Sequence, residues 1–279
     1  MSNNPPSNDD SRRAIGSPTL RAFSPKPSPA NTLARAQITV RFIVQARMGS
    51  SRLPGKVSRM LAGHTLLARV VERLQACRQF LDLRSGPNLQ FMVATTMDLA
   101  DDWTTSEGRR LGCQVFRGSS EDVLARYLAA SADLRPTDIV IRATADNPFY
   151  CPSRTAGILR RHLASRLEYT SIRNLSYVVP EVMRADALRR MAKVAGDAEC
   201  REHVTPYFRR TKHAIPLHVQ QLPQRWQGLR PEIRLTVDTL PEYEAAQRIY
   251  DHLSAAGRQF SLEDVYNYLD ERHGNRRAA

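Results

Sequence analysis

The sequence predicts an α/β fold, in which a mostly parallel, mixed sheet carries helices on both faces. Strand-like and helix-like segments alternate in the first half in the order βαβαβαβ, which is typical of parallel strands joined by crossover helices. The chain has 279 residues, of which 42% are hydrophobic and 25% charged, so it is long enough for a large core and ordinary in composition. Ligands of such sheets bind beyond the carboxyl ends of the strands.

The first half supplies four apolar runs of strand length, at 38–45, 89–96, 113–116 and 138–144. Between them, apolar residues at helical spacing predict a helix at 66–77. A polar helix is expected at 101–111, and a third helix at 120–131. Ser120 is a plausible N-cap of the third helix.

The second half is less regular. Its strand-like segments are 168–172, 177–183, 215–222 and 232–239. Its helix-like segments are 185–195, 199–210 and 241–257, the last with Pro241 in its first turn.

The two ends of the chain differ in composition from the middle. Residues 1–36 hold six of the seventeen prolines and few apolar residues, so we expect a disordered tail. A transit peptide is the weaker reading, because Asp9 and Asp10 interrupt its basic character. We expect one folded domain at 37–258 and a C-terminal helix with a basic tail at 259–279.

The formal net charge of +13 favours polyanionic partners such as nucleotides, nucleic acid or an anionic surface, although a solvated basic surface would give the same number. The four cysteines are scattered without zinc-site spacing, which fits a reducing compartment. No apolar run approaches the ~18 residues of a membrane span, and no secretory signal is visible. We therefore expect a cytoplasmic protein without membrane contact.

The loop after the first strand, "QARMGSSRLPGK", concentrates cations. Arg47, Arg52 and Lys56 stand among Gly49 and Gly55, which permit tight turns and close approach of a ligand. Together with backbone N–H groups and the N-terminus of the following helix, they predict a site for a polyphosphate. A solvated basic loop is the alternative.

Two better known phosphate motifs do not fit this loop. A P-loop needs four residues between its glycines and a hydroxyl after the lysine. Five residues separate Gly49 from Gly55, and Val57 follows Lys56. The chain also lacks G-x-G-x-x-G, so a dinucleotide-binding fold loses its main support.

The loop resembles the signature of the sugar cytidylyltransferases, which activate 3-deoxy-manno-octulosonate and acylneuraminate sugars with CTP. The branch most similar is the spore-coat polysaccharide biosynthesis type. The resemblance covers about residues 38–255 and continues in the segments "FRGSSEDVLARYLAA", "VIRATADNPF", "REHVTPYFRR" and "RLTVDTLPEYEAAQRIYDHL".

This resemblance implies a Rossmann-like fold of the nucleotide-diphospho-sugar transferase kind and a homodimer. It implies that the CTP phosphates are held by Arg47, Ser50, Arg52 and Lys56, and that Gln45 and Ala46 lie near the base. Gly118 and Ser119 resemble the base-recognition segment.

Asp146 and Asp238 each follow a strand-like segment at its carboxyl end. Either could cap the next helix. Together with a phosphate loop they also suit Mg²⁺, which prefers one or two carboxylates plus phosphate oxygens and water. The resemblance implies the same, because the magnesium-binding aspartates of the family align with these two. The chain has no D-x-D, which disfavours a nucleotide-sugar glycosyltransferase.

His203 and Tyr207 are four residues apart and share one face if 199–210 is a single helix. An isolated histidine is often a core residue, but the resemblance makes both candidates for the acceptor site or a subunit contact. The chain departs from the family at 176–188, where Tyr177, Val178 and Val179 replace Gly, Leu and Asp. A different acceptor or a loss of activity would each follow.

The hypothesis is a magnesium-dependent enzyme that transfers CMP from CTP to a small acidic acceptor, a sugar acid or a phosphonate, in surface polysaccharide or related biosynthesis. Arg52, Lys56, Asp146 and Asp238 are its catalytic candidates. The alternatives are a glycosyltransferase, an inactive relative and a basic nucleic-acid-binding protein; the last lacks an aromatic stacking platform.

Overall fold

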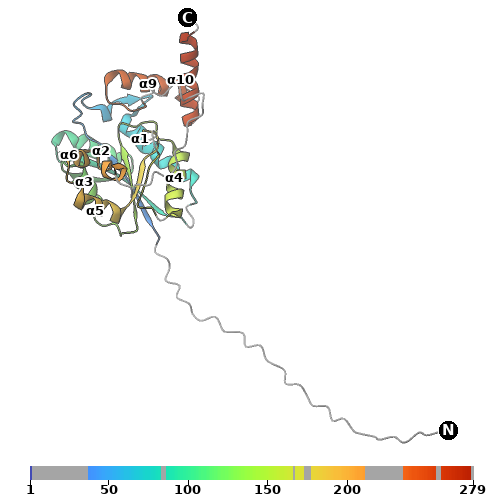
Figure 1. The fold of residues 1–279 in the computed structure, drawn as a ribbon. Helices are drawn as coiled ribbons and strands as arrows, with labels where there is room; N and C mark the ends of the chain where they lie inside the picture. The colour runs from blue at the N-terminus through green and yellow to red at the C-terminus, as the bar shows by residue number, and fades with distance from the viewer. Residues whose placement is uncertain are drawn as a thin grey trace. The chain divides into compact units, whose positions relative to one another are not determined.

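The centre of the molecule is a six-stranded sheet with helices on both faces (Figure 1). The computed structural model describes Met1 and residues 37–82, 86–165, 167–172, 177–210, 235–255 and 259–277. The expected tail at 2–36 and the expected strand at 215–222 lie outside these residues.

The strand order is β5-β4-β1-β6-β8-β7. β1 pairs in parallel with β4 and β6, and β4 pairs in parallel with β5. β8 runs antiparallel to β6 and β7, so the sheet is mixed, as predicted. The strands are β1 (Thr39–Gln45), β4 (Asn88–Thr96), β5 (Gln114–Gly118), β6 (Ile139–Thr144), β7 (Tyr169–Thr170) and β8 (Glu181–Arg184).

Successive side chains of each strand point to opposite faces of the sheet, so the strands contribute to two hydrophobic cores, one on each face. Phe42 and Ile141 belong to one core, with residues of α1 (Leu66–Gln75), α4 (Pro152–Ala164), α9 (Leu240–Ser254) and α10 (Leu262–Arg277). Ile43 and Val140 belong to the other, with residues of α3 (Val123–Ala129), α5 (Ala185–Val194), α6 (Ala198–His203) and α7 (Pro206–Arg210). α2 (Asp102–Arg110) packs through Gly108 against Val93 and Val115 of the first core.

The chain turns at several short elements. β2 (Met60–Leu61) and β3 (His64–Thr65) form a small hairpin, which the sequence analysis missed. It also missed α4. The 3-10 turns are η1 (Lys56–Ser58), η2 (Ala76–Phe80) and η3 (Leu99–Asp101).

The predicted strands and helices of the first half are confirmed, with one shifted helix start. The N-cap of α3 is Asp122, whose carboxylate accepts from the N–H of Ala125 at 2.8 Å; the expectation of Ser120 was wrong. Ser119 accepts in turn from the N–H of Asp122 at 2.9 Å, so the chain makes a hydrogen-bonded turn before the helix begins.

Three expectations for the second half were wrong. The strand expected from residue 177 begins only at Glu181, because Pro180 has no N–H to give to a ladder. The described residues 235–239 form no strand, although Leu235 and Val237 are buried. The single helix expected at 199–210 is two helices, α6 and α7.

The C-terminal helix α10 packs into the first core. Phe260, Leu262, Val265 and Tyr266 are all buried there. No helix among the described residues has the length and apolar character that a membrane crossing requires.

Candidate active site

A pocket of about 420 Å³ opens at the carboxyl ends of β1 and β6. The chain runs from β1 to one side of the sheet through β4 and β5, and then to the other side with β6. The pocket therefore lies where the strand order reverses, which is the usual ligand site of such sheets, and its volume suits a small ligand.

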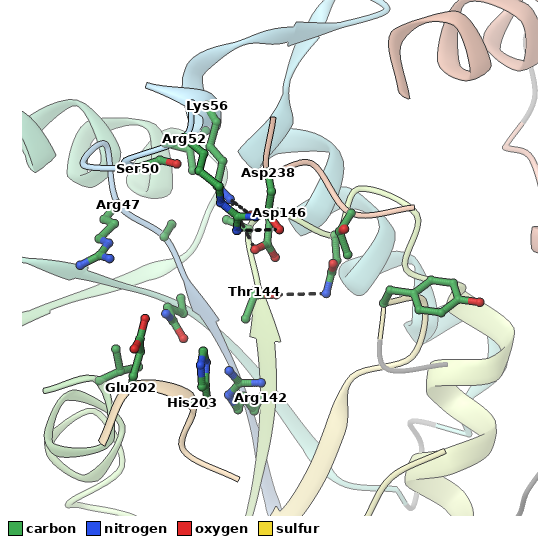
Figure 2. A pocket seen from close by; sticks show the side chains of 18 of the residues that line it. Arg47, Ser50, Arg52, Lys56, Arg142, Thr144, Asp146, Glu202, His203 and Asp238 are labelled. Atoms are coloured by element: carbon green, nitrogen blue, oxygen red, sulfur yellow. Dashed lines mark hydrogen bonds and ion pairs between the residues drawn. The ribbon is translucent and has the colours of Figure 1, made fainter. Parts of the chain in front are cut away.

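Most of the site residues expected from the sequence line this pocket: Gln45, Ala46, Arg47, Ser50, Arg52, Lys56, Asp146, His203 and Asp238. Gly118, Ser119 and Tyr207 are not among its lining residues. Figure 2 shows two groups, with Arg52, Lys56 and both aspartates in one, and Arg142, Glu202 and His203 in the other.

The loop after β1 is closed by its own backbone. The N–H groups of Ser50 and Gly55 both donate to the carbonyl of Met48 at 2.9 Å. Gly55 has φ +68°, a conformation in which a side chain would be strained. The N–H of Met48 donates to the buried carboxylate of Asp101 at 2.7 Å, which fixes the start of the loop.

The positive charge of this loop comes from its side chains. The residues after it form only the three-residue turn η1, and the first long helix begins at Leu66, beyond the hairpin. The expectation that a following helix N-terminus completes the site was therefore wrong. Arg47, Arg52 and Lys56 all reach the pocket, and the guanidinium of Arg47 donates to the carbonyl of Ser120 at 3.1 Å.

Lys56 lies between the two predicted carboxylates (Figure 2). Its Nζ is 2.8 Å from Oδ1 of Asp238 and 3.5 Å from Oδ2 of Asp146. Arg52 adds a contact of 3.1 Å to the other oxygen of Asp238. The side chain of Lys56 is only 13% exposed, whereas that of Arg52 is 59% exposed. Asp238 is thus paired with both Lys56 and Arg52, and Lys56 also contacts Asp146.

Backbone contacts set the positions of both aspartates. The hydroxyl of Tyr150 accepts from the N–H of Thr144 at 3.0 Å and from the amide of Asn147 at 3.1 Å, which fixes the turn that carries Asp146. The N–H of Val237 donates to the carbonyl of Asp146 at 2.8 Å and brings the segment of Asp238 alongside.

Neither aspartate caps a helix, so the capping alternative was wrong. The N-cap of α9 is Thr239, which forms a capping box with Glu242. The N-cap of α4 is Cys151. Both carboxylates are therefore free to face the pocket.

The electrostatics of Asp238 follow from its surroundings. Burial alone would raise the pKa of this carboxyl, but the hydrogen bond and charge of Lys56, helped by Arg52, lower it below its ordinary value. Asp238 is therefore ionised at neutral pH. No group of three or more metal-ligating side chains occurs within the described residues. Two carboxylates beside a cationic loop still fit Mg²⁺, which takes its other ligands from phosphate and water.

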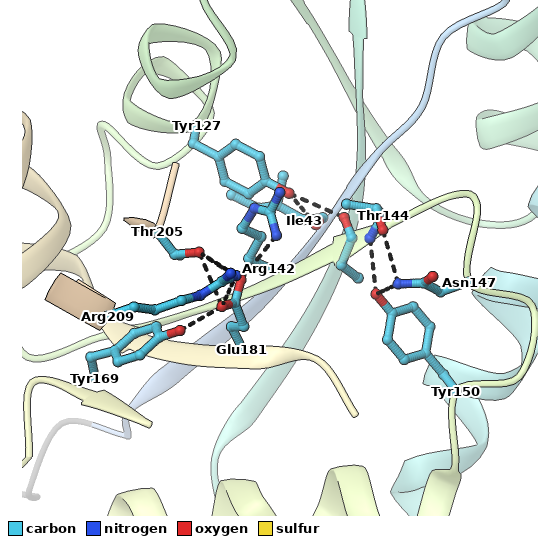
Figure 3. A network of polar contacts seen from close by, with 11 residues as sticks. Ile43, Tyr127, Arg142, Thr144, Asn147, Tyr150, Tyr169, Glu181, Thr205 and Arg209 are labelled. Atoms are coloured by element: carbon cyan, nitrogen blue, oxygen red, sulfur yellow. Dashed lines mark hydrogen bonds and ion pairs between the residues drawn. The ribbon is translucent and has the colours of Figure 1, made fainter. Parts of the chain in front are cut away.

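The second group of pocket residues, which includes Arg142, is organised around Glu181 on β8 (Figure 3). Glu181 is buried and accepts from Nη1 of Arg142 at 2.9 Å, from Arg209 at 2.8 Å, and from the hydroxyls of Thr205 and Tyr169. Burial would raise its pKa, but the charges of Arg142 and Arg209 outweigh this and lower it.

A strained turn joins α6 to α7 and places His203 in the pocket. The N–H of Thr205 donates to the carbonyl of His203 at 2.7 Å, and Val204 between them has φ 66° and ψ −54°. This is a γ-turn of the rare positive-φ kind. Pro206, which cannot continue a helix from residue 205, starts α7. Tyr207 consequently packs against Phe208 and the second core instead of sharing a face with His203.

Gly118 and Ser119 lie beside the site. A Cβ at residue 118 would come within 2.8 Å of the ring of Phe116, so packing explains this glycine. Ser119 is exposed, and its carbonyl accepts from the guanidinium of Arg126 at 2.6 Å.

Sequence reasoning missed Asp101, Arg142, Glu181 and Thr205 as site residues. Asp101 stands in a run of acidic residues that looks like an ordinary helix start. A charged residue inside the apolar strand "DIVIRAT" was the visible signal for Arg142. A polar residue at such a buried position commonly has a partner, and here the partner is Glu181.

A mixed α/β sheet with a cationic loop and two carboxylates at its switch point suits a nucleotide-binding enzyme, and the comparisons with known proteins identify it as a nucleotidyltransferase. The family model of cytidylyltransferases matches residues 41–266. This chain belongs to the cytidylyltransferase family.

Known proteins are similar to this chain in sequence and in fold. The chain is 34% identical over 211 residues to the spore coat polysaccharide biosynthesis protein SpsF of Bacillus subtilis, a match that covers 75% of this chain and 85% of that protein. Its fold is similar to a cytidylyltransferase from Leptospira borgpetersenii, with TM-score 0.67, 23% identity and coverage of 85% and 96% of the two chains. It is also similar to CMP:2-keto-3-deoxy-manno-octonic acid synthetase complexed with CTP, with TM-score 0.54, 14% identity and coverage of 77% and 99%.

Proposed function

We propose that this enzyme transfers CMP from CTP to an acidic sugar or a related acceptor, such as a phosphonate, and releases pyrophosphate. The observation that carries the proposal is the position of Lys56 between Asp146 and Asp238, beside a loop with two further arginines. The similarity to a synthetase solved with CTP supports the choice of nucleotide. The similarity to SpsF supports a role in surface polysaccharide or related biosynthesis.

The reaction needs positioning and charge neutralisation more than covalent help. An acceptor oxygen attacks the α-phosphorus of CTP, and an attacking hydroxyl gives its proton to water. A new P–O bond forms, and the bond from the α-phosphorus to the bridging oxygen breaks. Pyrophosphate leaves with the electron pair. Arg52 and Lys56 bind the departing phosphates, and Arg47 and Ser50 hold the triphosphate in line. Gln45 and Ala46 lie near the base, with Gly118 and Ser119 beyond them.

Asp146 and Asp238 would hold Mg²⁺ together with phosphate oxygens. When bound, the ion would supply positive charge to the phosphates and to the attacking oxygen. Without the ion, Lys56 lies between the two carboxylates and limits their mutual repulsion. We further propose that the enzyme is cytoplasmic and that it forms a homodimer. Light scattering of the purified chain would test the homodimer.

Asparagine substitutions test the roles of the two aspartates. Asp146→Asn and Asp238→Asn should each lower kcat for magnesium-dependent pyrophosphate release by at least about 100-fold, because each keeps the shape and removes a charged metal ligand. Asp251→Asn, at an exposed position on α9, is the matched control and should leave kcat unchanged.

Circular dichroism must show that all three variants stay folded. Retained turnover in Asp146→Asn and Asp238→Asn would overturn the assignment of the carboxylates. Release of a nucleoside diphosphate from a nucleotide-sugar donor, with no release of pyrophosphate from CTP, would instead identify a glycosyltransferase.

A further inference from the structure

The pocket contains an arginine with unused hydrogen-bond donors. Arg142 projects from β6, and its side chain is 13% exposed. Nη1 donates to Glu181, but Nε is buried and has no acceptor among the described residues. Nε and Nη2 form the edge of a guanidinium that binds a carboxylate through two parallel hydrogen bonds.

Glu181 does not neutralise this group, because it is shared. Its carboxylate is paired with Arg209 as well as with Arg142, so the three ionised side chains carry a net charge of +1. The side chain of Arg209 is 52% exposed, so solvent screens part of this charge, but those of Arg142 and Glu181 are only 13% and 3% exposed, and excess charge beside them is costly unless another group balances it. A ligand with one negative charge would do so.

The position of Arg142 separates it from the phosphate loop. Figure 2 shows Arg142 next to His203, away from Arg52 and Lys56. Arg142 lies on β6, four residues before Asp146, which follows the carboxyl end of that strand, so Arg142 lies on the β6 side of the proposed metal site. The phosphates already have the loop cations as partners, and Arg142 is left for the second substrate.

We propose that Arg142 binds the carboxylate of the acceptor and is a specificity-determining residue of this enzyme. Glu181 is the positioning residue, because it holds Nη1 of Arg142 and leaves Nε and Nη2 without an acceptor among the described residues. Thr205 couples this pair to the turn that carries His203, through its hydrogen bonds to both carboxylate oxygens of Glu181 at 3.0 and 2.9 Å. The inference rests on the proposed function, since it assigns the acceptor end of the same pocket.

The test compares sugar acids with the matching primary alcohols, in which the carboxylate is reduced to CH₂OH. Pyrophosphate release with CTP and Mg²⁺ is measured for the panel, which includes 3-deoxy-manno-octulosonate and N-acetylneuraminate. The wild type should accept an acid and not its alcohol. Arg142→Gln should raise KM for that acid roughly 10- to 100-fold, as expected for a lost bidentate contact, while the Kd for CTP stays within about twofold.

Arg142→Lys separates charge from geometry. It keeps the charge but loses the planar fork, so its KM should fall between those of the wild type and Arg142→Gln. A purely structural role for Arg142 would lower Tm and would change CTP and acceptor binding alike, which would overturn the inference. Equal use of acid and alcohol by the wild type, or an unchanged KM in Arg142→Gln, would also overturn it.

If no acceptor is turned over, the binding of the acceptor can be measured directly. Saturation-transfer NMR on the CTP-loaded wild type should detect an acid from the panel, and the signal should be lost in Arg142→Gln. An absent signal in the CTP-loaded wild type would overturn the role of Arg142. A wild type that does not bind CTP would contradict the proposed function itself.

Discussion

At the scale of single residues, Lys56 organises the site. Of the two loop cations that contact a carboxylate, Lys56 is less exposed than Arg52, and it contacts both aspartates. Arg52 and Lys56 were chosen from the sequence because cations in a glycine-containing loop suit phosphate. No local pattern in the sequence indicates that these cations pair with Asp146 and Asp238. That pairing depends on segments that are 90 and 182 residues away from Lys56 along the chain.

Substitution of Lys56 should change the titration of Asp238. In Lys56→Gln only Arg52 opposes the effect of burial, so the pKa of Asp238 should rise relative to the wild type. A carboxyl ¹³C NMR titration would measure this shift. Lys193→Gln, at an exposed position on α5, is the matched control and should leave the pKa of Asp238 where it is.

The same pair predicts a pH-dependent stability. The folded-state pKa of Asp238 is lowered, so its contribution is fully present above the unfolded-state value of about 3.9 and is lost as the pH falls through the folded-state value. Urea unfolding at pH 7 should show Lys56→Gln less stable than the wild type by roughly 1–3 kcal/mol, and the difference should shrink below about pH 4. A difference that grows towards low pH would contradict the pairing.

At the scale of elements, the turn between α6 and α7 stores strain next to the pocket. Val204 is buried and β-branched, yet it has positive φ. Such a conformation persists only where its surroundings enforce it, and it often marks a functional site. Here it sends His203 into the pocket and Thr205 to Glu181. Pro206 was a readable sign that the helix breaks, but the direction of the turn depends on contacts that a local pattern does not contain.

The strain at Val204 can be tested by comparing its glycine and alanine substitutions, because strain should cancel or reverse the usual advantage of alanine in stability. Alanine is ordinarily more stabilising than glycine by roughly 0.5–1 kcal/mol, but positive φ costs an L-residue about 1–2 kcal/mol. Val204→Gly should therefore be at least as stable as Val204→Ala. Val182, buried in β8 with extended backbone, is the matched control, and there glycine should be the less stable substitution. Chemical denaturation measures all four variants, and a clear preference for alanine at residue 204 would remove the argument for strain.

At the scale of the whole molecule, the C-terminal helix completes the core under the pocket. The carbonyl of Phe260 accepts from Arg73 at 3.2 Å, and its ring packs against that of Tyr250. Tyr266 on α10 contacts the hydroxyl of Tyr177, a pocket residue, at 3.3 Å. The substituted segment at 177–179 is therefore supported by residues near the end of the chain.

Two truncations test this organisation. A chain of residues 37–279 should keep pyrophosphate release and Tm, in line with a first segment of 36 residues that the enzyme does not need. A chain of residues 37–258 should lose both, because it exposes the surface that Phe260, Leu262 and Val265 cover. A stable, active 37–258 chain would show that α10 is dispensable.

The fold was more predictable than the site. β1, β4 and β6 are buried runs whose apolar character is visible in the sequence, and their parallel order follows from the intervening helices. That the loop after β1 and both aspartates line one pocket was also predictable, for the aspartates mainly through a family resemblance; their roles stay predictions. Asp101 and the Glu181 network were not, because each acts through contacts between segments distant in sequence, which no local pattern records.

The most direct test of the central claim is magnesium-dependent pyrophosphate release with CTP, UTP, ATP and GTP, each offered with a panel of acidic sugars and phosphonates. The account predicts release with CTP and an acidic acceptor, and its loss in Asp146→Asn. Release that is equal with all four nucleotides, or that survives in Asp146→Asn, would contradict it.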